Sequence, residues 1–523
     1  MPTFKLDEQV IEYQPGDTII QAAHRAGVDI PHYCWHPGLS VAANCRMCLV
    51  EIMPPPGRPS IQLDVLRFDE AKGDYVKAKK PKLQPACQQG VSENMEVKSQ
   101  SSEHVREARS AVQEFLLLNH PVDCPICDQA GECRLQDYWL EHSGKKKRMK
   151  DEIVHKPKAV DFGPTIVYDA ERCIVCTRCV RFCEEVVKDP VLDKRERGNL
   201  GEIVLAPGRQ LDHDYTLMTE YVCPVGALTA KDFRFKARVW FLRSVRSVCQ
   251  GCASGCNSFT DYDPRNQTVY RHRPRENMAI NKYWMCDAGM LDYRRIHENR
   301  VLDARVGGRK ASVDDALSAA AKALSQASPE QSALLLSALH SNEDNFALYE
   351  LAKQLGITRV YLAGKPAGKG DDILRSADKN PNRAGVLALL GDQKPGDLAA
   401  LAADIDGGKV TTVLAVGSDI EDPARATSLS KAKVVALVTH EGPVAQLGHV
   451  VLPASSWAEA EGTFVNEKGI SQVSEKAIAP QGNSLPAWTW VIRLGEALGK
   501  ALPFKKAKEV KAASSQISAG ASA

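Results

Sequence analysis

The spacing of apolar and polar residues predicts the first elements of the chain. Residues 3–13 predict two short strands joined by a polar turn, and residues 18–26 predict a helix. Thr18 and Gln21 stand where a capping box begins a helix, and Gly27 stands where a left-handed residue ends one. The pattern therefore predicts strand, strand and helix ahead of the first cysteine.

A second helix is predicted over residues 102–119. Five apolar residues recur there at helical spacing: Val105, Ala108, Val112, Phe115 and Leu116. Pro121 follows closely, so the helix ends ahead of it and presents His120 at its end. Between the two helices, the proline-rich and charged segment 49–86 predicts an insertion.

Beyond residue 300 the pattern changes to short apolar runs that alternate with helical stretches. The runs that predict strands are 333–338, 359–363, 385–390, 410–416, 433–438 and 450–452. This alternation is typical of an open parallel α/β sheet of about six strands. Residues 504–523 contain too little apolar surface to fold alone and predict a disordered tail.

Composition limits the class of protein. A chain of 523 residues predicts several domains, and a net charge of +2 gives no broad field that would attract nucleic acid. We find no apolar run as long as a membrane span, and the N-terminus lacks the pattern of a signal or transit peptide, so we expect an intracellular protein. All sixteen cysteines lie between Cys34 and Cys286. Reduced cysteines at this density indicate metal or redox sites in the first part of the chain.

The cysteines fall into groups with the spacing of cluster ligands. Cys34, Cys45, Cys48 and Cys87 combine a CxxC pair with one upstream and one distant cysteine, which predicts a 2Fe-2S site. In the string HPVDCPICDQAGEC, three cysteines leave one ligand position open, and a histidine ahead of them can fill it. Taken alone, His120 would more often be a helix-ending residue than a ligand, so the spacing predicts Cys124, Cys127 and Cys133 as 4Fe-4S ligands and leaves His120 as a candidate for the fourth position.

The third group contains one cysteine more than a cubane needs. Cys173, Cys176 and Cys179 form CxxCxxC, and either Cys183 or Cys223 could complete the set. Glu184 follows Cys183, whereas Cys223 opens the string CPVGAL, a typical closing segment. We therefore predict Cys223 as the fourth ligand and Cys183 as a free thiol.

The fourth group is Cys249, Cys252, Cys256 and Cys286, with the spacing CxxCxxxC and a distant partner. This spacing resembles the N-terminal 4Fe-4S motif of the molybdopterin oxidoreductase family. Zinc remains an alternative for this group and for the first one, because CxxC with a remote partner also builds zinc sites.

These motifs together resemble the large peripheral-arm subunit of bacterial NADH:quinone oxidoreductase (respiratory complex I). The string HPVDCPICDQAGEC resembles its histidine-ligated cluster motif, and the order of the four groups is the same. The string HVVLPASSWAEAEGTFVNEKG resembles a segment that this subunit shares with molybdopterin enzymes.

The basic run 145–150 could be a docking patch, but its charge pattern favours a solvated linker between domains. The resemblance implies a multidomain α+β and α/β fold. The implied segments are a β-grasp 2Fe-2S ferredoxin domain at 1–100 with the insertion 49–86, a histidine-ligated 4Fe-4S domain at 101–145, a 4Fe-4S ferredoxin-like domain at 146–240, a molybdopterin-oxidoreductase-type 4Fe-4S domain at 241–300, a reduced molybdopterin-oxidoreductase-like α/β domain at 301–503 and the disordered tail at 504–523.

The resemblance also implies an electron-transfer role in an NADH dehydrogenase, with one 2Fe-2S and three 4Fe-4S clusters and no complete active site on this chain. Its implied partners are the flavin- and NADH-binding subunit and the iron–sulfur and quinone-site subunits, which hold it at the cytoplasmic face of the bacterial inner membrane. We expect no flavin on this chain, because it has neither GxGxxG after a strand nor a Walker A loop. We expect no molybdopterin, because the α/β part is short and lacks cysteine. Two alternatives remain: a diaphorase subunit of an NAD-linked hydrogenase or formate dehydrogenase, and a zinc-stabilised scaffold.

Overall fold

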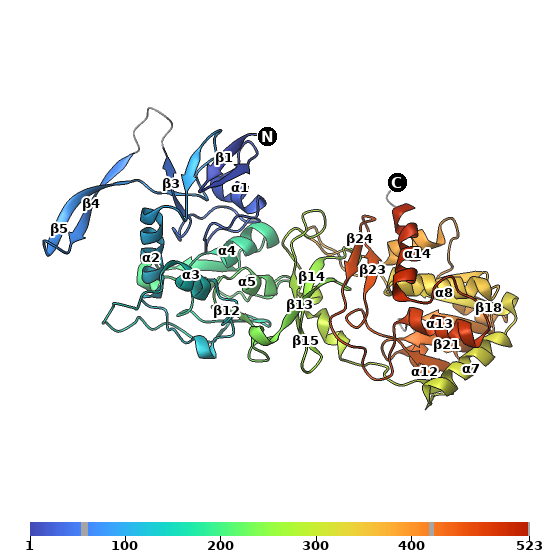
Figure 1. Ribbon diagram of the computed structural model, residues 1–523. Helices are drawn as coiled ribbons and strands as arrows, with labels where there is room; N and C mark the ends of the chain where they lie inside the picture. Colours follow the sequence, from blue (N-terminus) through green and yellow to red (C-terminus); the bar gives the residue numbers. More distant parts are fainter. Residues whose placement is uncertain (54–60, 418–422, 521–523) are drawn as a thin grey trace. The chain divides into compact units, whose positions relative to one another are not determined.

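The computed structural model describes residues 1–53, 61–417 and 423–520. The chain divides into two compact units, Met1–Trp240 and Phe241–Ala523 (Figure 1). We describe each unit by itself.

The first unit begins with a five-stranded sheet packed against one helix. The strands, in the order β2-β1-β7-β3-β6, are β1 (Thr3–Leu6), β2 (Gln9–Glu12), β3 (Leu49–Met53), β6 (Gln84–Pro85) and β7 (Glu96–Lys98). Helix α1 (Ile19–Arg25) buries Ile19 and Ile20 in the core of this domain. The Thr18 N–H donates to the Gln21 Oε1 at 2.9 Å, and Gly27 has φ +75°, so both predicted helix caps are present.

The predicted insertion is narrower in the structure. Strands β3 and β6 belong to the main sheet, and only β4 (Gln62–Asp69) and β5 (Asp74–Pro81) leave it, as a separate two-stranded hairpin (Figure 1). The prediction of 49–86 as one inserted segment was therefore too wide at both ends. The proline-rich patch at 54–59 lies outside the described residues.

The rest of the first unit is built from short elements between long loops. The predicted second helix is α2 (Glu103–Leu117), and its N-cap Ser102 accepts a hydrogen bond from the Val105 N–H. The remaining elements are a 3-10 turn (Cys124–Ile126), α3 (Arg134–His142), the sheet of β8 (Val160–Asp161), β9 (Ile166–Tyr168) and β12 (Leu228–Ala230), α4 (Arg178–Arg181), a π-helical turn (Phe182–Val187), the pair β10 (Leu192–Arg195) and β11 (Glu202–Leu205), and α5 (Leu217–Tyr221).

The second unit begins with an antiparallel sheet of β13 (Arg243–Val248), β14 (Asn257–Asp263) and β15 (Thr268–Pro274). Asp261 on β14 is buried and pairs with Arg271 at 2.7 Å and with Arg273 at 2.6 Å. Burial alone would raise the pKa of Asp261, but its bonds to the two arginines lower it to about 2. This sheet is followed by α6 (Asp287–Leu291), and the pair β23 (Gly462–Val465) and β24 (Ser471–Ser474) lies further along the chain.

A seven-stranded sheet forms the body of the second unit. Its order is β17-β16-β22-β21-β20-β18-β19, and the last five strands are parallel. These are β18 (Ser332–Ser337), β19 (Arg359–Ala363), β20 (Thr412–Val416), β21 (Lys433–Val438) and β22 (Val450–Pro453), with β16 (Arg305–Val306) and β17 (Arg309–Lys310) antiparallel at one edge.

Helices cover both faces of this sheet, as a parallel sheet requires. One face packs on α7 (Val313–Ser325), α8 (Asn342–Gln354) and α13 (Ala487–Ala497). The other packs on α10 (Leu398–Asp406), α11 (Pro423–Leu429) and α12 (Pro443–Leu447). The predicted α/β architecture of this region is confirmed.

Two predictions for the second unit were wrong. The run 385–390 is not a strand but lies in α9 (Arg383–Leu390), which buries Val386 and Leu390 four residues apart. The described part of the tail, 504–520, is not disordered, because α14 (Ala507–Gly520) follows Phe504 and contacts α8 and α9. Phe504 and Val510 are at most 1% exposed in the core.

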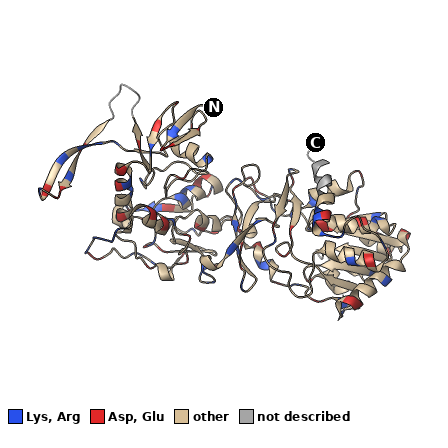
Figure 2. Ribbon diagram, viewed as in Figure 1, with Lys and Arg blue, Asp and Glu red and all other residues tan. Residues whose placement is uncertain are grey.

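Charged residues of both signs alternate over the elements of each unit (Figure 2). This mixture agrees with the small net charge of +2. Among the described residues, no helix combines the length and apolar character needed to cross a membrane.

Candidate metal centres

The first predicted site brings its four cysteines together in two pairs. Cys34, Cys45 and Cys48 lie on the loop between α1 and β3, and Cys87 follows β6. The thiols of Cys34 and Cys45 are hydrogen-bonded to each other, and so are those of Cys48 and Cys87. The two pairs lie within electrostatic range of each other. A binuclear cluster takes two thiolates on each iron, and this arrangement offers one pair to each.

The second predicted site surrounds a cavity of about 470 Å³. His120, Cys124, Cys127 and Cys133 all line it. Burial lowers the pKa of His120 to about 4, so its imidazole is neutral and can act as a ligand.

A glycine outside the predicted ligand set forms part of the wall of this cavity. Gly226 also lines it, and a Cβ at this position would collide with the Sγ of Cys127 and lie 3.0 Å from the Cβ of Gln129. Only glycine fits here without a shift of its neighbours. The sequence contained a signal for it, since Gly226 belongs to the string CPVGAL.

The third predicted site surrounds a small enclosed cavity. Cys173, Cys176, Cys179 and Cys223 all line it. Val175 and Thr177 have φ of +51° and +61°, unusual values for β-branched residues, and they wind the loop around the cavity. The N–H of Val175 donates to the Sγ of Cys173 at 3.3 Å.

Two cysteines of this third site, Cys176 and Cys179, are buried, and Cys173 and Cys223 are partly buried. Burial raises the pKa of Cys173, Cys176 and Cys223 to about 11. Such thiols stay protonated near neutral pH unless a bound cation compensates the thiolate charge. The chemistry of this donor set therefore fits a metal cluster.

Cys183 lies apart from the cavity. Its Sγ is 3.5 Å from the Nε2 of His213, and it is fully buried. Burial and the carboxylate of Asp189 raise the pKa of Cys183 to about 12. A buried thiol with this pKa is unreactive as a nucleophile.

The fourth predicted site lies in the second unit. Cys249, Cys252 and Cys256 lie on the turn between β13 and β14, and Cys286 is the N-cap of α6. The Gly251 N–H donates to the Sγ of Cys249 at 3.4 Å. A Cβ at Gly289 would lie 2.9 Å from the Sγ of Cys249, so the helix backbone approaches this thiol as closely as glycine allows.

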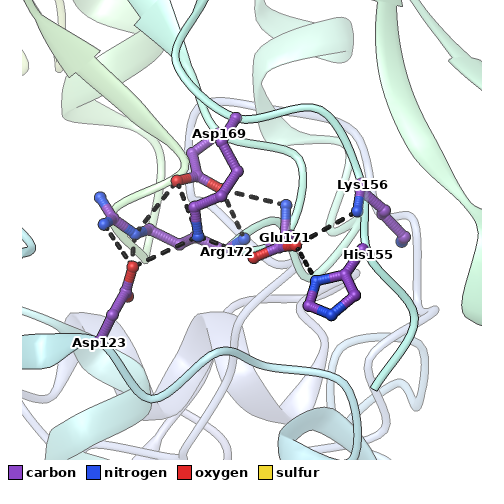
Figure 3. A network of polar contacts seen from close by, with 7 residues as sticks. Asp123, His155, Lys156, Asp169, Glu171 and Arg172 are labelled. Atoms are coloured by element: carbon purple, nitrogen blue, oxygen red, sulfur yellow. Dashed lines mark hydrogen bonds and ion pairs between the residues drawn. The ribbon is translucent and has the colours of Figure 1, made fainter. Parts of the chain in front are cut away.

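An ion-pair network joins the second and third sites (Figure 3). Asp123, next to Cys124, accepts two hydrogen bonds from Arg172, next to Cys173, at 3.1 and 2.6 Å. Burial alone would lower the pKa of Arg172, but its bond to Asp123 outweighs this and the pKa is raised. His155 and Lys158 extend the network through Glu171 and Asp169. The Nδ1 of His155 is 2.9 Å from the Oε1 of Glu171. The Nζ of Lys158 is 2.7 Å from the Oε2 of Glu171 and 3.6 Å from the Oδ2 of Asp169.

In the described part of the chain, no three or more His, Cys, Asp or Glu side chains lie close enough together to hold a single metal ion. A cluster places its own iron and sulfide atoms between its ligands, so its thiolates stand farther apart than the ligands of one ion.

A cavity also lies at the carboxyl edge of the parallel sheet of the second unit. Residues that follow β18, β21 and β22 line it, among them His340, His440 and Trp457. This is where open α/β sheets usually bind ligands. Its volume is about 60 Å³, well below the roughly 300–1,000 Å³ typical of pockets for small organic ligands.

Four known families match parts of the chain. The 2Fe-2S iron-sulfur cluster binding domain matches residues 1–102, and the NADH-ubiquinone oxidoreductase-G iron-sulfur binding region matches 109–148. The ferredoxin-like domain of NADH-quinone oxidoreductase subunit 3 matches 163–229, and the molybdopterin oxidoreductase family matches 364–497. These matches define an iron–sulfur protein with an attached domain of the molybdopterin oxidoreductase type, and they confirm the predicted fold class.

Among known proteins, the chain is similar to subunits of NADH-quinone and NADH-ubiquinone oxidoreductases. It is 33% identical to the potato mitochondrial NADH dehydrogenase [ubiquinone] iron-sulfur protein 1, over 76% of this chain and 52% of that protein. It is 32% identical to Thermus thermophilus NADH-quinone oxidoreductase subunit 3, over 75% and 51%, and 34% identical to the Neurospora crassa mitochondrial NADH-ubiquinone oxidoreductase 78 kDa subunit, over 76% and 52%. The chain is thus related to the large iron–sulfur subunits of NADH-quinone oxidoreductase. It spans about half the length of these relatives.

One solved structure, of an NAD+-reducing [NiFe]-hydrogenase in the H2-reduced state, is 27% identical over 46% of this chain and 91% of that chain. Its TM-score is 0.37, too low to carry a conclusion about shared architecture.

Proposed function

We propose that the chain is an electron-transfer subunit of an NADH:quinone oxidoreductase. It would relay electrons from a flavin-bearing partner subunit toward quinone through one 2Fe-2S cluster and three 4Fe-4S clusters. The observation that carries the proposal is that the predicted ligands of the second site line one cavity, and those of the third site line another, within a chain related to such subunits.

The ligand sets follow the four sites described above. Cys34, Cys45, Cys48 and Cys87 would hold the 2Fe-2S cluster. The cubanes would be held by His120, Cys124, Cys127 and Cys133; by Cys173, Cys176, Cys179 and Cys223; and by Cys249, Cys252, Cys256 and Cys286. When bound, the clusters supply sites that take up and release single electrons.

The protein contributes position, polarity and exclusion of water. The N–H groups that donate to Cys173 and Cys249 stabilise negative charge on these sulfurs and thereby favour electron uptake. The neutral imidazole of His120 replaces a thiolate, which removes one negative charge from its cluster and acts in the same direction.

We further propose that the chain carries neither flavin nor molybdopterin. The cavity of about 60 Å³ at the carboxyl edge of the sheet supports this for the pterin, since it is far smaller than the roughly 300–1,000 Å³ of pockets that bind small organic ligands. The partners would be the flavin- and NADH-binding subunit and the iron–sulfur and quinone-site subunits. These would hold the chain at the cytoplasmic face of the bacterial inner membrane, without direct contact with lipid or nucleic acid.

Metal analysis of the chain itself, purified without oxygen and separated from other iron–sulfur subunits, tests this function. Full occupancy gives about fourteen iron atoms and as many labile sulfides per chain. Zinc in place of iron, fewer than about ten irons per chain, or stoichiometric molybdenum or tungsten would contradict the proposal. Mass identification of the co-purified subunits separates it from the hydrogenase and formate dehydrogenase alternative, whose partners would be a hydrogenase or a molybdenum subunit.

A further inference from the structure

Two buried arginines connect the first and third sites. Arg178 and Arg181 flank Cys179 on α4, and both side chains reach the loop that carries Cys34. The Arg181 Nη2 donates to the carbonyl of Cys34 at 2.5 Å and to the carbonyl of Cys176 at 3.3 Å. One guanidinium thus touches the backbone of a ligand residue from each site.

Arg178 makes a parallel connection. Its guanidinium donates to the carbonyl of Trp35, next to Cys34, and to the carbonyl of Val222, next to Cys223, the latter at 3.3 Å. The thiols of Cys176, Cys34 and Cys45 all lie within electrostatic range of Arg178. Both arginines are therefore placed between the two sets of thiols, although about 140 residues separate the two loops along the chain.

The charge of these arginines has no carboxylate partner in the described part of the chain. Arg178 and Arg181 are 9% and 8% exposed, and their acceptors are backbone carbonyls and the Thr177 hydroxyl. Glu185 hydrogen-bonds instead to the Ser40 N–H, at 2.8 Å, and to the Ser40 hydroxyl. Arg172, by contrast, has a carboxylate partner, because its Nη2 lies 2.6 Å from the Oδ2 of Asp123.

Burial of an unpaired cation costs several kcal/mol, so a compensating negative charge is required nearby. Cluster-bound thiolates at Cys34, Cys45 and Cys176 would supply it, because metal binding removes their protons. We infer that Arg178 and Arg181 are shared counterions of the first and third clusters, and that they raise the reduction potentials of both. The inference rests on the proposed ligand sets and goes beyond the proposed relay function.

A counterion shared by two clusters acts on both potentials. Removal of one positive charge disfavours the added electron at each cluster, so both potentials must fall together. A residue that only holds the local backbone would disturb the cluster next to it and leave the other unchanged. The two reduction potentials are therefore the measurement that separates an effect of charge from an effect of local structure.

The test is an EPR-monitored redox titration of the purified complex containing Arg181→Gln. We expect the equilibrium constant for reduction to fall about tenfold or more for both clusters, a shift of 59 mV per tenfold for a one-electron couple. Arg181→Lys keeps the charge and should recover most of the shift. Arg25→Gln is the matched control, because Arg25 is exposed and paired with Asp17, and it should move neither potential.

Iron content of every variant is measured first. Absence of iron in the unmodified complex would overturn the proposed function itself. Full iron with both potentials unmoved in Arg181→Gln, or with only one moved, would overturn the shared-counterion inference. If Arg181→Gln loses a cluster, the same titration is carried out on Arg178→Gln. A fall of both reduction potentials in that variant supports the inference, and unchanged potentials contradict it.

Discussion

Replacement of Gly226 by alanine probes the wall of the second site. The added Cβ would fall closer than 3.0 Å to the Sγ of Cys127, a distance that real Cβ atoms essentially never show, and it would also lie only 3.0 Å from the Cβ of Gln129. The Sγ must therefore retreat by roughly 1 Å to reach ordinary contact. Overpacking of this kind costs about 1–3 kcal/mol.

The strain displaces a candidate cluster ligand, because Gly226 and Cys127 line the same cavity. A loss of about 2 kcal/mol corresponds to a factor of about 30 in affinity for the cluster. We expect Gly226→Ala to lose the EPR signal of the histidine-ligated cubane and about four irons per chain, while the third cluster remains.

The matched control is Gly90→Ala in the same unit, where the nearest atom to an added Cβ is the Asp17 carbonyl oxygen at 3.9 Å. Iron analysis and EPR spectra of both variants, prepared side by side without oxygen, provide the comparison. If Gly226→Ala retained the iron and the spectrum of Gly90→Ala, the steric argument would be refuted.

Three further predictions concern single residues. Cys183→Ser should keep all iron, whereas Cys223→Ser should lose or damage one cubane; exchanged phenotypes in metal analysis would reverse the ligand assignment. His120→Cys adds a negative charge, so redox titration should find a lower potential for that cubane, and an unchanged potential would remove His120 from the ligand set. Asp261→Asn removes the charge of a buried carboxylate that pairs with Arg271 and Arg273, and it should reduce the stability of the second unit by about 3–5 kcal/mol at neutral pH. Thermal unfolding should show a smaller loss for Asp263→Asn, whose arginine partner is 61% exposed on its side chain, and equal losses would contradict the burial argument.

The sequence predicted local elements well where cap chemistry and periodicity agreed. Thr18, Gln21 and Gly27 marked both ends of α1, and the parallel strands β19 and β21 lie at the predicted residues. The prediction of a strand at 385–390 was wrong because a run of five apolar side chains after Gly385 fits a buried strand and a buried helix equally well. Its helical state is decided by packing of Val386 and Leu390 against the core, which is tertiary information.

The prediction of a disordered tail was wrong for a similar reason. Residues 504–523 have little apolar content, yet Phe504 and Val510 fill space beside α8 and α9 that the rest of the domain leaves open. An amphipathic segment that is unstable alone can fold against a preformed surface. Sequence composition measures only the isolated segment.

The spacing of the cysteines along the sequence predicted the candidate ligands, but it did not predict which residues surround them. Nothing in the sequence pairs Asp123 with Arg172, or places Arg181 against the loop of Cys34. These contacts join segments tens to more than a hundred residues apart, and they depend on how the domains of the first unit pack. The groups that tune charge at the sites therefore became visible only in the folded chain.

The β4–β5 hairpin offers a point of attachment for a label. Its tip, between Asp69 and Asp74, is exposed and contains Gly73 with φ +61°, and exposed loop tips tolerate insertion best. Among the described residues, its two strands pair with each other and lie outside the five-stranded sheet that carries the flanking ligand loops. A short epitope inserted at this tip would mark the subunit for electron microscopy or gentle affinity capture while the cysteine loops stay intact.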